Sequence, residues 1–167
     1  PTNELDREYG FAQLAWDDEY LYFAASVPRV PQVPVSPPSR GNRSHDADLA
    51  GRDRIRLVLD VDRDYATWYR LEFDQRGWVN ECCWEDRGWN PRMFVATDGD
   101  ATRWRIEAAI SLKDLVPLAP RFGETWAVEV VRTVPGHRLS AWTMPAGVEV
   151  RPESFGLVRF VQAARSR

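Results

Sequence analysis

Short segments of alternating apolar and polar residues recur along this 167-residue chain, and they constrain its fold more than any other feature. A period of two is typical of β-strands, because successive side chains point to opposite faces. Residues that favour turns separate the segments, as in an antiparallel sandwich. We expect strands at residues 12–17, 19–27, 53–61, 67–74, 78–85, 92–97, 101–110, 124–134, 138–143 and 156–162. The sequence therefore predicts an all-β protein with an antiparallel, jelly-roll-like β-sandwich.

One segment has a helical signal. Ser111 could cap a short helix over residues 111–115, and Pro117 would end it. Residues 28–52 form neither a helix nor a strand, because five prolines at positions 28, 31, 34, 37 and 38 exclude a central strand. We expect a long exposed loop there, within a single domain that spans residues 1–167. The chain begins with Pro1 and not with Met, so we expect it to be a fragment of a longer protein.

The charge pattern bears on the choice of partner. With 22 basic and 25 acidic residues the net charge is −3, and no basic field favours nucleic acid or an anionic membrane. No apolar run approaches the roughly 20 residues that cross a bilayer. Cys82 and Cys83 are adjacent, so a strand would send them to opposite faces, and we expect two free thiols.

The hairpin over residues 67–85 offers the clearest candidate site. Asp74-Gln75-Arg76-Gly77 suits a type I turn followed by a bulge at Gly77, which would pair Phe73 with Val79 and Trp68 with Trp84. Apolar residues then share one face, although Glu81 falls among them without an explanation. The opposite face carries Trp68, Arg70, Glu72, Trp78, Asn80, Cys82 and Trp84.

A face of indole rings beside hydrogen-bonding groups suits a sugar, which needs apolar walls and a few polar partners. Trp89 and Trp142 could add a wall to it. Alternatively, Trp68 and Trp84 only stabilise the hairpin as a cross-strand pair, worth roughly 0.2–1 kcal/mol. Three further tryptophans, Trp16, Trp104 and Trp126, fall in strands expected to form the core. Arg132 ends a core strand, and we expect it to pair with an acid at the rim and not to point into a cleft.

The order of several segments resembles the family 9 carbohydrate-binding modules. These are LAWDDEYLYFAASV at 14–27, DRIRLVLD at 53–60, WRIEAAISLKDL at 104–115, GETWAVEVVR at 123–132, SAW at 140–142 and FGLVRF at 155–160. The resemblance implies a non-catalytic β-sandwich that binds a sugar or a polysaccharide chain end, often with structural calcium. It also implies an exported protein, extracellular or periplasmic, in which the module is attached to other domains.

The binding residues of that family transfer only in part. Its two sugar-clamping tryptophans fall on Ala50-Gly51 and on Glu149-Val150, and an acid that contacts the sugar falls on Arg56. One strand arginine of the family is retained as Arg70. The resemblance thus implies the fold and leaves Trp68, Arg70 and their neighbours as the candidate sugar contacts.

Other chemistry has weaker support. Asp60, Asp62 and Asp64 alternate as in a calcium loop but lack its Gly and Glu, and Asp46 and Asp48 are another possible oxygen pair. We find no nucleophile, zinc or phosphate-loop motif, so we predict no enzymatic activity. Two alternatives remain. One is a haem-binding electron-transfer domain, whose only candidate ligands are Met93, Met144, His45 and His137. The other is an interaction domain without a small ligand.

Overall fold

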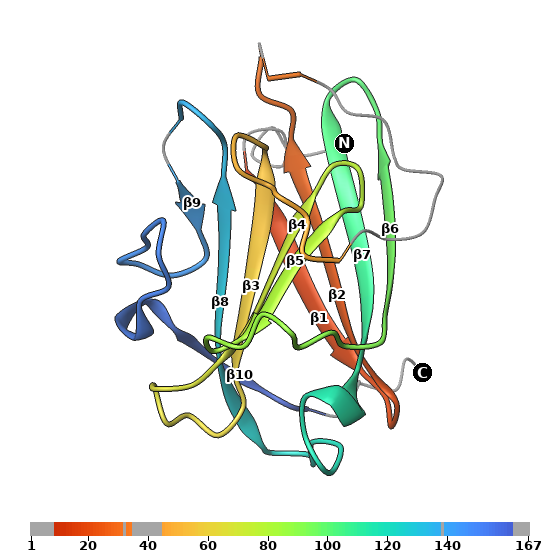
Figure 1. Cartoon of the computed structure of the whole chain (residues 1–167), viewed down its shortest axis with the longest axis vertical. Coiled ribbons are helices and arrows are strands. Elements are labelled where there is room, and N and C mark those ends of the chain that lie inside the picture. The colour runs from red at the N-terminus through yellow and green to blue at the C-terminus, as the bar shows by residue number, and fades with distance from the viewer. Residues whose placement is uncertain (1–8, 32, 35–44, 138, 162–167) are drawn as a thin grey trace, which may run out of the picture.

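Two antiparallel sheets face each other in the computed structural model, which describes residues 9–31, 33–34, 45–137 and 139–161 (Figure 1). Sheet A has the strand order β1-β2-β7-β6, and sheet B has the order β10-β8-β3-β4-β5, with β9 paired to β8. The strands of sheet A are β1 (Phe11–Trp16), β2 (Tyr20–Pro28), β7 (Arg103–Ser111) and β6 (Met93–Gly99). Those of sheet B are β10 (Gly156–Arg159), β8 (Thr125–Thr133), β3 (Arg54–Asp60), β4 (Tyr69–Asp74), β5 (Val79–Cys83) and β9 (Ser140–Ala141). This arrangement confirms the predicted β-sandwich.

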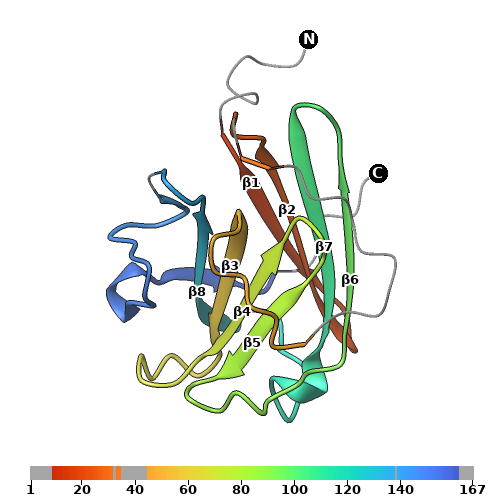
Figure 2. The same cartoon turned by 45° about the horizontal axis from the view of Figure 1, so that its top comes forward.

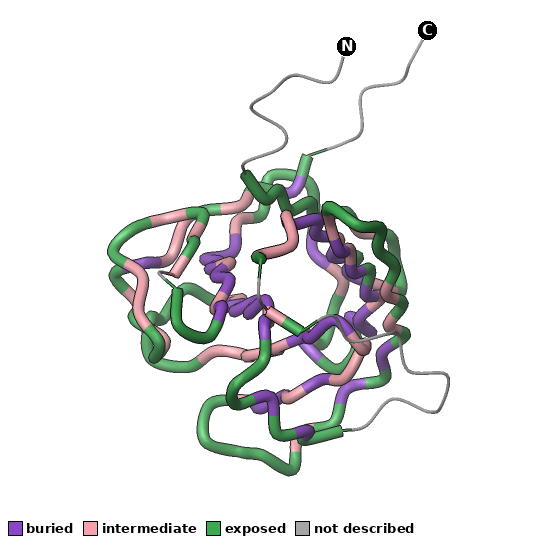
Figure 3. Tube along the Cα trace, turned by 90° about the horizontal axis from the view of Figure 1, so that it is seen from above, coloured by how far each residue is buried: buried purple, intermediate pink, exposed green. Residues whose placement is uncertain are grey.

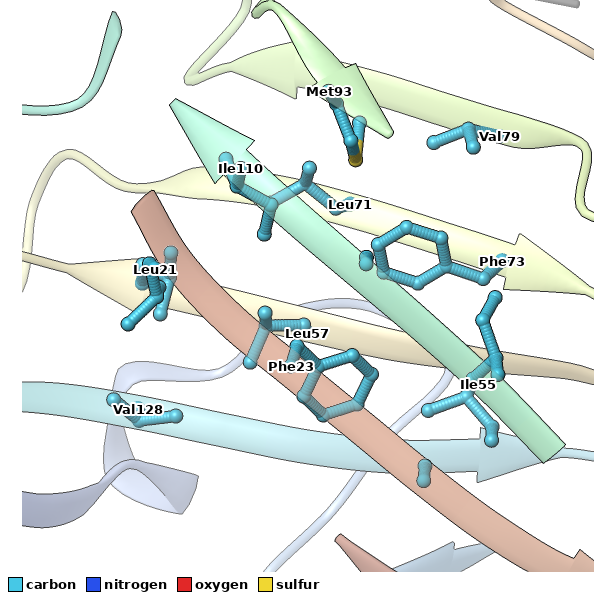
Figure 4. Close-up of a cluster of buried hydrophobic side chains, with 14 of the residues drawn as sticks. Leu21, Phe23, Ile55, Leu57, Leu71, Phe73, Val79, Met93, Ile110 and Val128 are labelled. Carbon is cyan, nitrogen blue, oxygen red and sulfur yellow. The ribbon is translucent and has the colours of Figure 1, made fainter. Parts of the chain in front are cut away.

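The core lies between the sheets, whose strands cross at an angle (Figure 2). Buried positions lie along the inner strands of both sheets, whereas the connecting loops are mostly exposed (Figure 3). Phe23 of β2 and Phe73 of β4 stack across the core with ring centroids 5.8 Å apart (Figure 4). Trp104 and Trp126 are almost fully buried, and Trp16 packs against the same cluster. The predicted core role of these three tryptophans is therefore confirmed.

The β4–β5 hairpin has the predicted register. Phe73 pairs with Val79, and the Trp84 amide donates to the Trp68 carbonyl over 2.8 Å. The turn closes through a 3.0 Å bond from the Gly77 amide to the Asp74 carbonyl, and Gly77 has φ +80°, a conformation that glycine adopts without steric cost. Because the side chains alternate from this fixed point, the polar set of the hairpin faces outward.

Short helical turns differ in part from the expectation. Leu112–Asp114 forms a 3₁₀ turn where a helix was expected, but the Ser111 side chain makes no capping bond. The cap assignment was wrong, because Ser111 still belongs to β7 and its backbone amide is held by the Arg92 carbonyl over 2.9 Å. A second 3₁₀ turn, Pro152–Ser154, has no counterpart in the sequence prediction. Within the described residues, no helix is long and apolar enough to cross a membrane.

The Pro-rich loop is described at its two ends only. Strand β2 continues through Pro28, so the loop begins later than expected, and residues 32 and 35–44 lie outside the described residues. At its far end the Ala47 amide donates to the Val79 carbonyl over 3.0 Å, and Ala47 and Leu49 are buried. Residues 45–52 therefore pack beside β5, where they border the outer face of sheet B.

Candidate functional site

The outward face of the β4–β5 hairpin brings together most of the predicted site residues. On this face, the β4 side of the hairpin carries Trp68, Arg70 and Glu72. The β5 side carries their cross-strand neighbours Trp84, Cys82 and Asn80. An Arg70 Nη2 donates to Asn80 Oδ1 over 3.0 Å, and Asn80 Nδ2 donates to the Ala47 carbonyl over 3.2 Å. The end of the Pro-rich loop thus fixes the amide that orients the arginine.

Arg70 has unused hydrogen-bonding capacity. Its Nε atom is buried and has no partner among the described residues. The adjacent Glu72 is engaged with Arg54, with 3.4 Å between Oε2 and Nε. A buried donor without an acceptor is costly. Arg54 Nε also lacks a hydrogen bond but has the Glu72 carboxylate 3.4 Å away, so Arg70 would gain more from an added acceptor.

Aromatic rings gather at one end of the same face. The rings of Trp68 and Trp84 meet edge to face at 5.0 Å, and Phe155 packs edge-on against Trp68 at 5.9 Å. Tyr65 then stacks on Phe155 at 6.3 Å. Trp84 is 45% exposed and Tyr65 equally so, which leaves two rings open to solvent on either side of Trp68. The sequence analysis missed Tyr65 and Phe155, because both lie in loops without a strand pattern.

The backbone of both exposed rings is unusual. Trp84 has φ +54° and Tyr65 has φ +55°, in the left-handed region that bulky residues rarely adopt. Such conformations cost of order 1–3 kcal/mol each and concentrate at functional sites. At Trp84 this conformation follows directly after the β5 strand, so the turn decides how the indole is presented.

Three other predicted site tryptophans lie elsewhere. Trp78 sits at the hairpin turn beneath the Arg76 guanidinium, 3.8 Å from the ring centroid. Trp89 packs against the core-facing Tyr69 at 4.8 Å, and its Nε1 donates to the Asp114 carbonyl over 3.1 Å. Trp142 lines a cleft between the sheets. The expectation that Trp89 and Trp142 wall the Trp68 surface was wrong, because the loops that carry them turn to the inner side of sheet B.

The β3–β8 half of the outer face is closed by residues 147–149. Arg56 is nearly fully buried and pairs with buried Glu129, with 2.9 Å between Nη2 and Oε2. The same guanidinium donates to the carbonyls of Gly147, over 2.9 Å, and Val148. Ser154 Oγ contacts the other Glu129 oxygen. The arginine that replaces an expected sugar-contacting acid is therefore a structural clamp on this loop.

Arg132 forms the predicted ion pair. It binds Asp53 through two bonds of 2.9 and 2.7 Å, and Trp104 Nε1 donates to the same carboxylate over 2.9 Å. Arg132 also lines the cleft of about 640 Å³ that opens between β1 and the β8–β10 edge. The other lining residues are mostly aliphatic and aromatic. Within the part of the chain that the structure describes, no His, Met or Cys lines this cleft.

The four candidate haem ligands lie in different environments. Met93 packs in the core, Met144 is largely exposed, and His45 Nδ1 lies 2.6 Å from Glu81 Oε1. His137 lies in an exposed turn. The bond from His45 also accounts for Glu81, the polar residue on the inner face of β5, since it gives the buried carboxylate a partner. Cys82 and Cys83 are free, as expected.

Acidic residues gather after β3. Asp60, Asp62 and Asp64 each place an oxygen within 4.8 Å of the others, and they are the only such group among the described residues. Asp60 accepts the amides of Arg63, over 2.6 Å, and Tyr65, over 3.0 Å. Burial raises the pKa of Asp60, against the lowering effect of these amides. The carboxylates stabilise a tight turn and still have oxygen lone pairs that a cation could use. Calcium binding at this turn stays a prediction. Asp46 and Asp48 gather no third acid.

Comparison with solved structures finds the same type of β-sandwich in other proteins. One similar structure is a family 9 carbohydrate-binding module from Caldicellulosiruptor kristjanssonii in complex with glucose. Its TM-score is 0.62 and its identity 17%, over 95% of this chain and 79% of that chain. A structure of such a module from the same organism, in complex with cellotriose, gives 0.62 and 18%, over 93% and 77%.

A candidate carbohydrate-binding protein from Bacteroides uniformis also shares the fold, with a TM-score of 0.62 and 12% identity over 90% of this chain and 78% of that chain. No protein-family model and no curated protein sequence matches the chain. At these identities the matches show a shared fold, which confirms the family 9-like sandwich. In this chain the two expected clamp positions, Ala50 and Glu149, are both exposed and carry no ring.

Proposed function

We propose that this chain is a carbohydrate-binding module without catalytic activity, and that the outer face of the β4–β5 hairpin holds its sugar. The observation that carries this proposal is that an exposed indole, Trp84, packs against Trp68 on the face that also carries Arg70. The structural neighbours that hold glucose and cellotriose support the class of ligand.

The chemistry of the face fits a pyranose. The C–H side of the sugar packs on the Trp84 ring, because an aromatic face is apolar and carries partial negative charge. Hydroxyl groups need fixed donors and acceptors, which Arg70, Glu72 and Asn80 provide further along the same face. A small shift of the guanidinium toward a bound hydroxyl would also satisfy the buried Arg70 Nε.

The same arrangement argues against glycoside hydrolysis at this face. A hydrolase uses two carboxyl groups on either side of the scissile bond, about 5–10 Å apart. Here Glu72 is the carboxylate nearest to Arg70 along β4, and it is held by Arg54. We propose that a glucose-based sugar or a polysaccharide chain end binds without being cleaved.

The test is isothermal titration of glucose and cellotriose into the wild type and two variants, Trp84→Ala and Arg70→Met. Each variant should weaken binding by about fivefold or more, since stacking and a charged hydrogen bond are each worth roughly 1 kcal/mol or more. Trp142→Ala is the matched control, because it removes an indole that is also about half exposed from the other side of sheet B. Unchanged affinity in both site variants, or an equal loss in the control, would refute this site.

Three broader features complete the proposal. We place the module outside the cytoplasm, extracellular or periplasmic, attached to other domains of a larger protein, with calcium at Asp60, Asp62 and Asp64 in a structural role. Carboxylate oxygens are a ligand type that this ion prefers. A rise in melting temperature with added calcium, reversed by a chelator and absent in Asp62→Asn, would support that role.

A further inference from the structure

A second group of exposed rings lies on the outer face of sheet A, on the side of the molecule opposite to the proposed site. Tyr20 and Tyr22 of β2 and Phe94 of β6 point outward, and Phe94 is 62% exposed. The Tyr20 ring lies 6.1 Å from Tyr22 and 6.0 Å from Phe94, so it joins the other two. Sandwich faces that meet only water seldom keep such an apolar patch.

The register places small residues between and beside these rings. Ala15, Tyr22, Ala109 and Phe94 follow one another across the four strands, and Gln13, Ala24, Glu107 and Ala96 form the next row. Since neighbouring strands lie about 4.8 Å apart, the backbones of Tyr22 and Phe94 are roughly 10 Å apart. Only the Ala109 methyl separates them within the row, which leaves a flat strip with a ring at each side.

Polar groups hold the rings and surround the strip. Tyr22 Oη donates to Asp17 Oδ2 over 2.7 Å, a bond that lowers the pKa of Asp17 and raises that of Tyr22. Asp17 is fixed in turn by the amides of Glu19 and Tyr20, each at 2.8 Å from its Oδ1. The Arg92 guanidinium lies 5.6 Å from the centre of the Tyr20 ring. The Tyr22 ring is therefore oriented before any ligand arrives.

We propose that this strip is a second carbohydrate-binding surface, which takes an extended stretch of a neutral glycan lying across the strands. Rings separated by a small residue offer apolar planes to the C–H faces of successive sugars, while Glu107, Gln13 and Arg92 can meet the hydroxyls. The carboxylates of Asp17 and Glu107 would repel an acidic glycan or an anionic lipid headgroup. A purely apolar partner would leave the same carboxylates without water or a counter-charge.

The width of the strip sets the length of ligand. A single sugar can cover one ring, whereas a chain can contact Tyr22 and Phe94 together. Binding at this surface should therefore strengthen with chain length and be weak for glucose. The class of ligand is taken from the proposed function, whereas the binding surface is a different one.

The experiment titrates glucose and cellohexaose into the wild type, Phe94→Ala and Trp84→Ala. Leu118→Ala is the control, because it shortens another strongly exposed apolar side chain away from the strip. We expect Phe94→Ala to weaken cellohexaose binding by roughly fivefold, the size of one lost ring contact, and to leave glucose binding unchanged. Tyr22→Phe, which keeps the ring but loses the Asp17 bond, should have a smaller effect. Unchanged melting temperatures would show that the variants are folded.

The two proposals fail in different ways. Loss of all binding in Trp84→Ala, with wild-type cellohexaose affinity in Phe94→Ala, overturns the second surface and leaves the first. Cellohexaose binding that depends on Phe94 but not on Trp84 overturns the hairpin site and supports the second surface. Equal losses in Phe94→Ala and in the Leu118→Ala control, or no binding of either sugar by the wild type, overturn the second surface.

Discussion

The two halves of the outer face of sheet B carry similar residues and have different environments. On β3 and β8, Arg56 and Glu129 are buried beneath residues 147–149. On β3 and β4, Arg54 and Glu72 lie in the same sheet but are each about one-seventh exposed, and Arg54 Nη1 donates to the loop carbonyls of Leu49 and Arg52 only over 3.5 and 3.4 Å. One half is thus an ionic core and the other a surface that a ligand can reach.

The difference shows that an outward-facing position on a strand does not by itself decide the role of a charged residue. Arg54, Arg56 and Arg70 all point outward from neighbouring strands, yet Arg56 clamps a loop, Arg54 lies against Glu72, and Arg70 is bound to Asn80 and keeps a buried nitrogen without a partner. What separates Arg56 from Arg54 is how closely the neighbouring loop binds the guanidinium, since Arg56 donates to a loop carbonyl over 2.9 Å and Arg54 only over 3.4 and 3.5 Å.

The largest expected effect comes from breaking the covered half. Arg56→Met should lower the free energy of unfolding by about 3–5 kcal/mol, because it leaves Glu129 buried without a counter-charge. Arg54→Met, the matched change in the open half, should cost about 1 kcal/mol or less. Urea denaturation of both variants checks this, and equal losses would show that the halves do not differ.

A smaller effect tests the loop contact itself. Ser154→Ala removes a hydroxyl that contacts Glu129 and should cost about 2 kcal/mol, the range for hydrogen bonds to charged groups. Ser140→Ala, at an exposed position of β9, should change stability very little. The comparison would be contradicted by a Ser154 variant as stable as the Ser140 variant in the same urea titration.

The smallest expected effect concerns Asp60, at the end of β3 where the two halves meet. Burial raises its pKa, so the folded state holds this proton more tightly than the unfolded state. Its contribution to stability is therefore present below the ordinary aspartate pKa of about 3.9 and is lost as pH rises through the raised value. Asp60→Asn should remove that slope in unfolding experiments at a series of pH values. Saturating calcium should reduce the wild-type slope if the ion binds, because a cation favours the charged carboxylate.

The positions of most strands and the hairpin register were accessible from the sequence. Alternation and the Asp74–Gly77 turn place Phe73 opposite Val79 without any tertiary information, and the apolar face then fixes what points outward. The pairing of Arg132 with an acid was also predictable, since a charge at the rim of a core needs a partner.

The loops account for what sequence reasoning could not place. Trp89 lies in a segment without a period, and the strand expected at residues 138–143 is only Ser140–Ala141, so Trp142 follows it and strand alternation does not place its ring. Phe155 joins Trp68 only because residues 147–154 fold back over β8. The outer rings Tyr22 and Phe94 do follow strand alternation, but their proximity depends on β7 lying between β2 and β6, which is a matter of topology.

The clamp formed by Arg56 has a further consequence for how this surface can change over time. It holds residues 147 and 148 by their main-chain oxygens, which every amino acid possesses, and so places no demand on the side chains there. Mutations at Val148 or Glu149 can sample new shapes and charges while the segment keeps its position. Because of this anchor, the sequence of the loop can vary while its backbone stays in place. A tryptophan introduced at Glu149 would therefore add an aromatic side chain beside the outer face of sheet B without a change of the backbone.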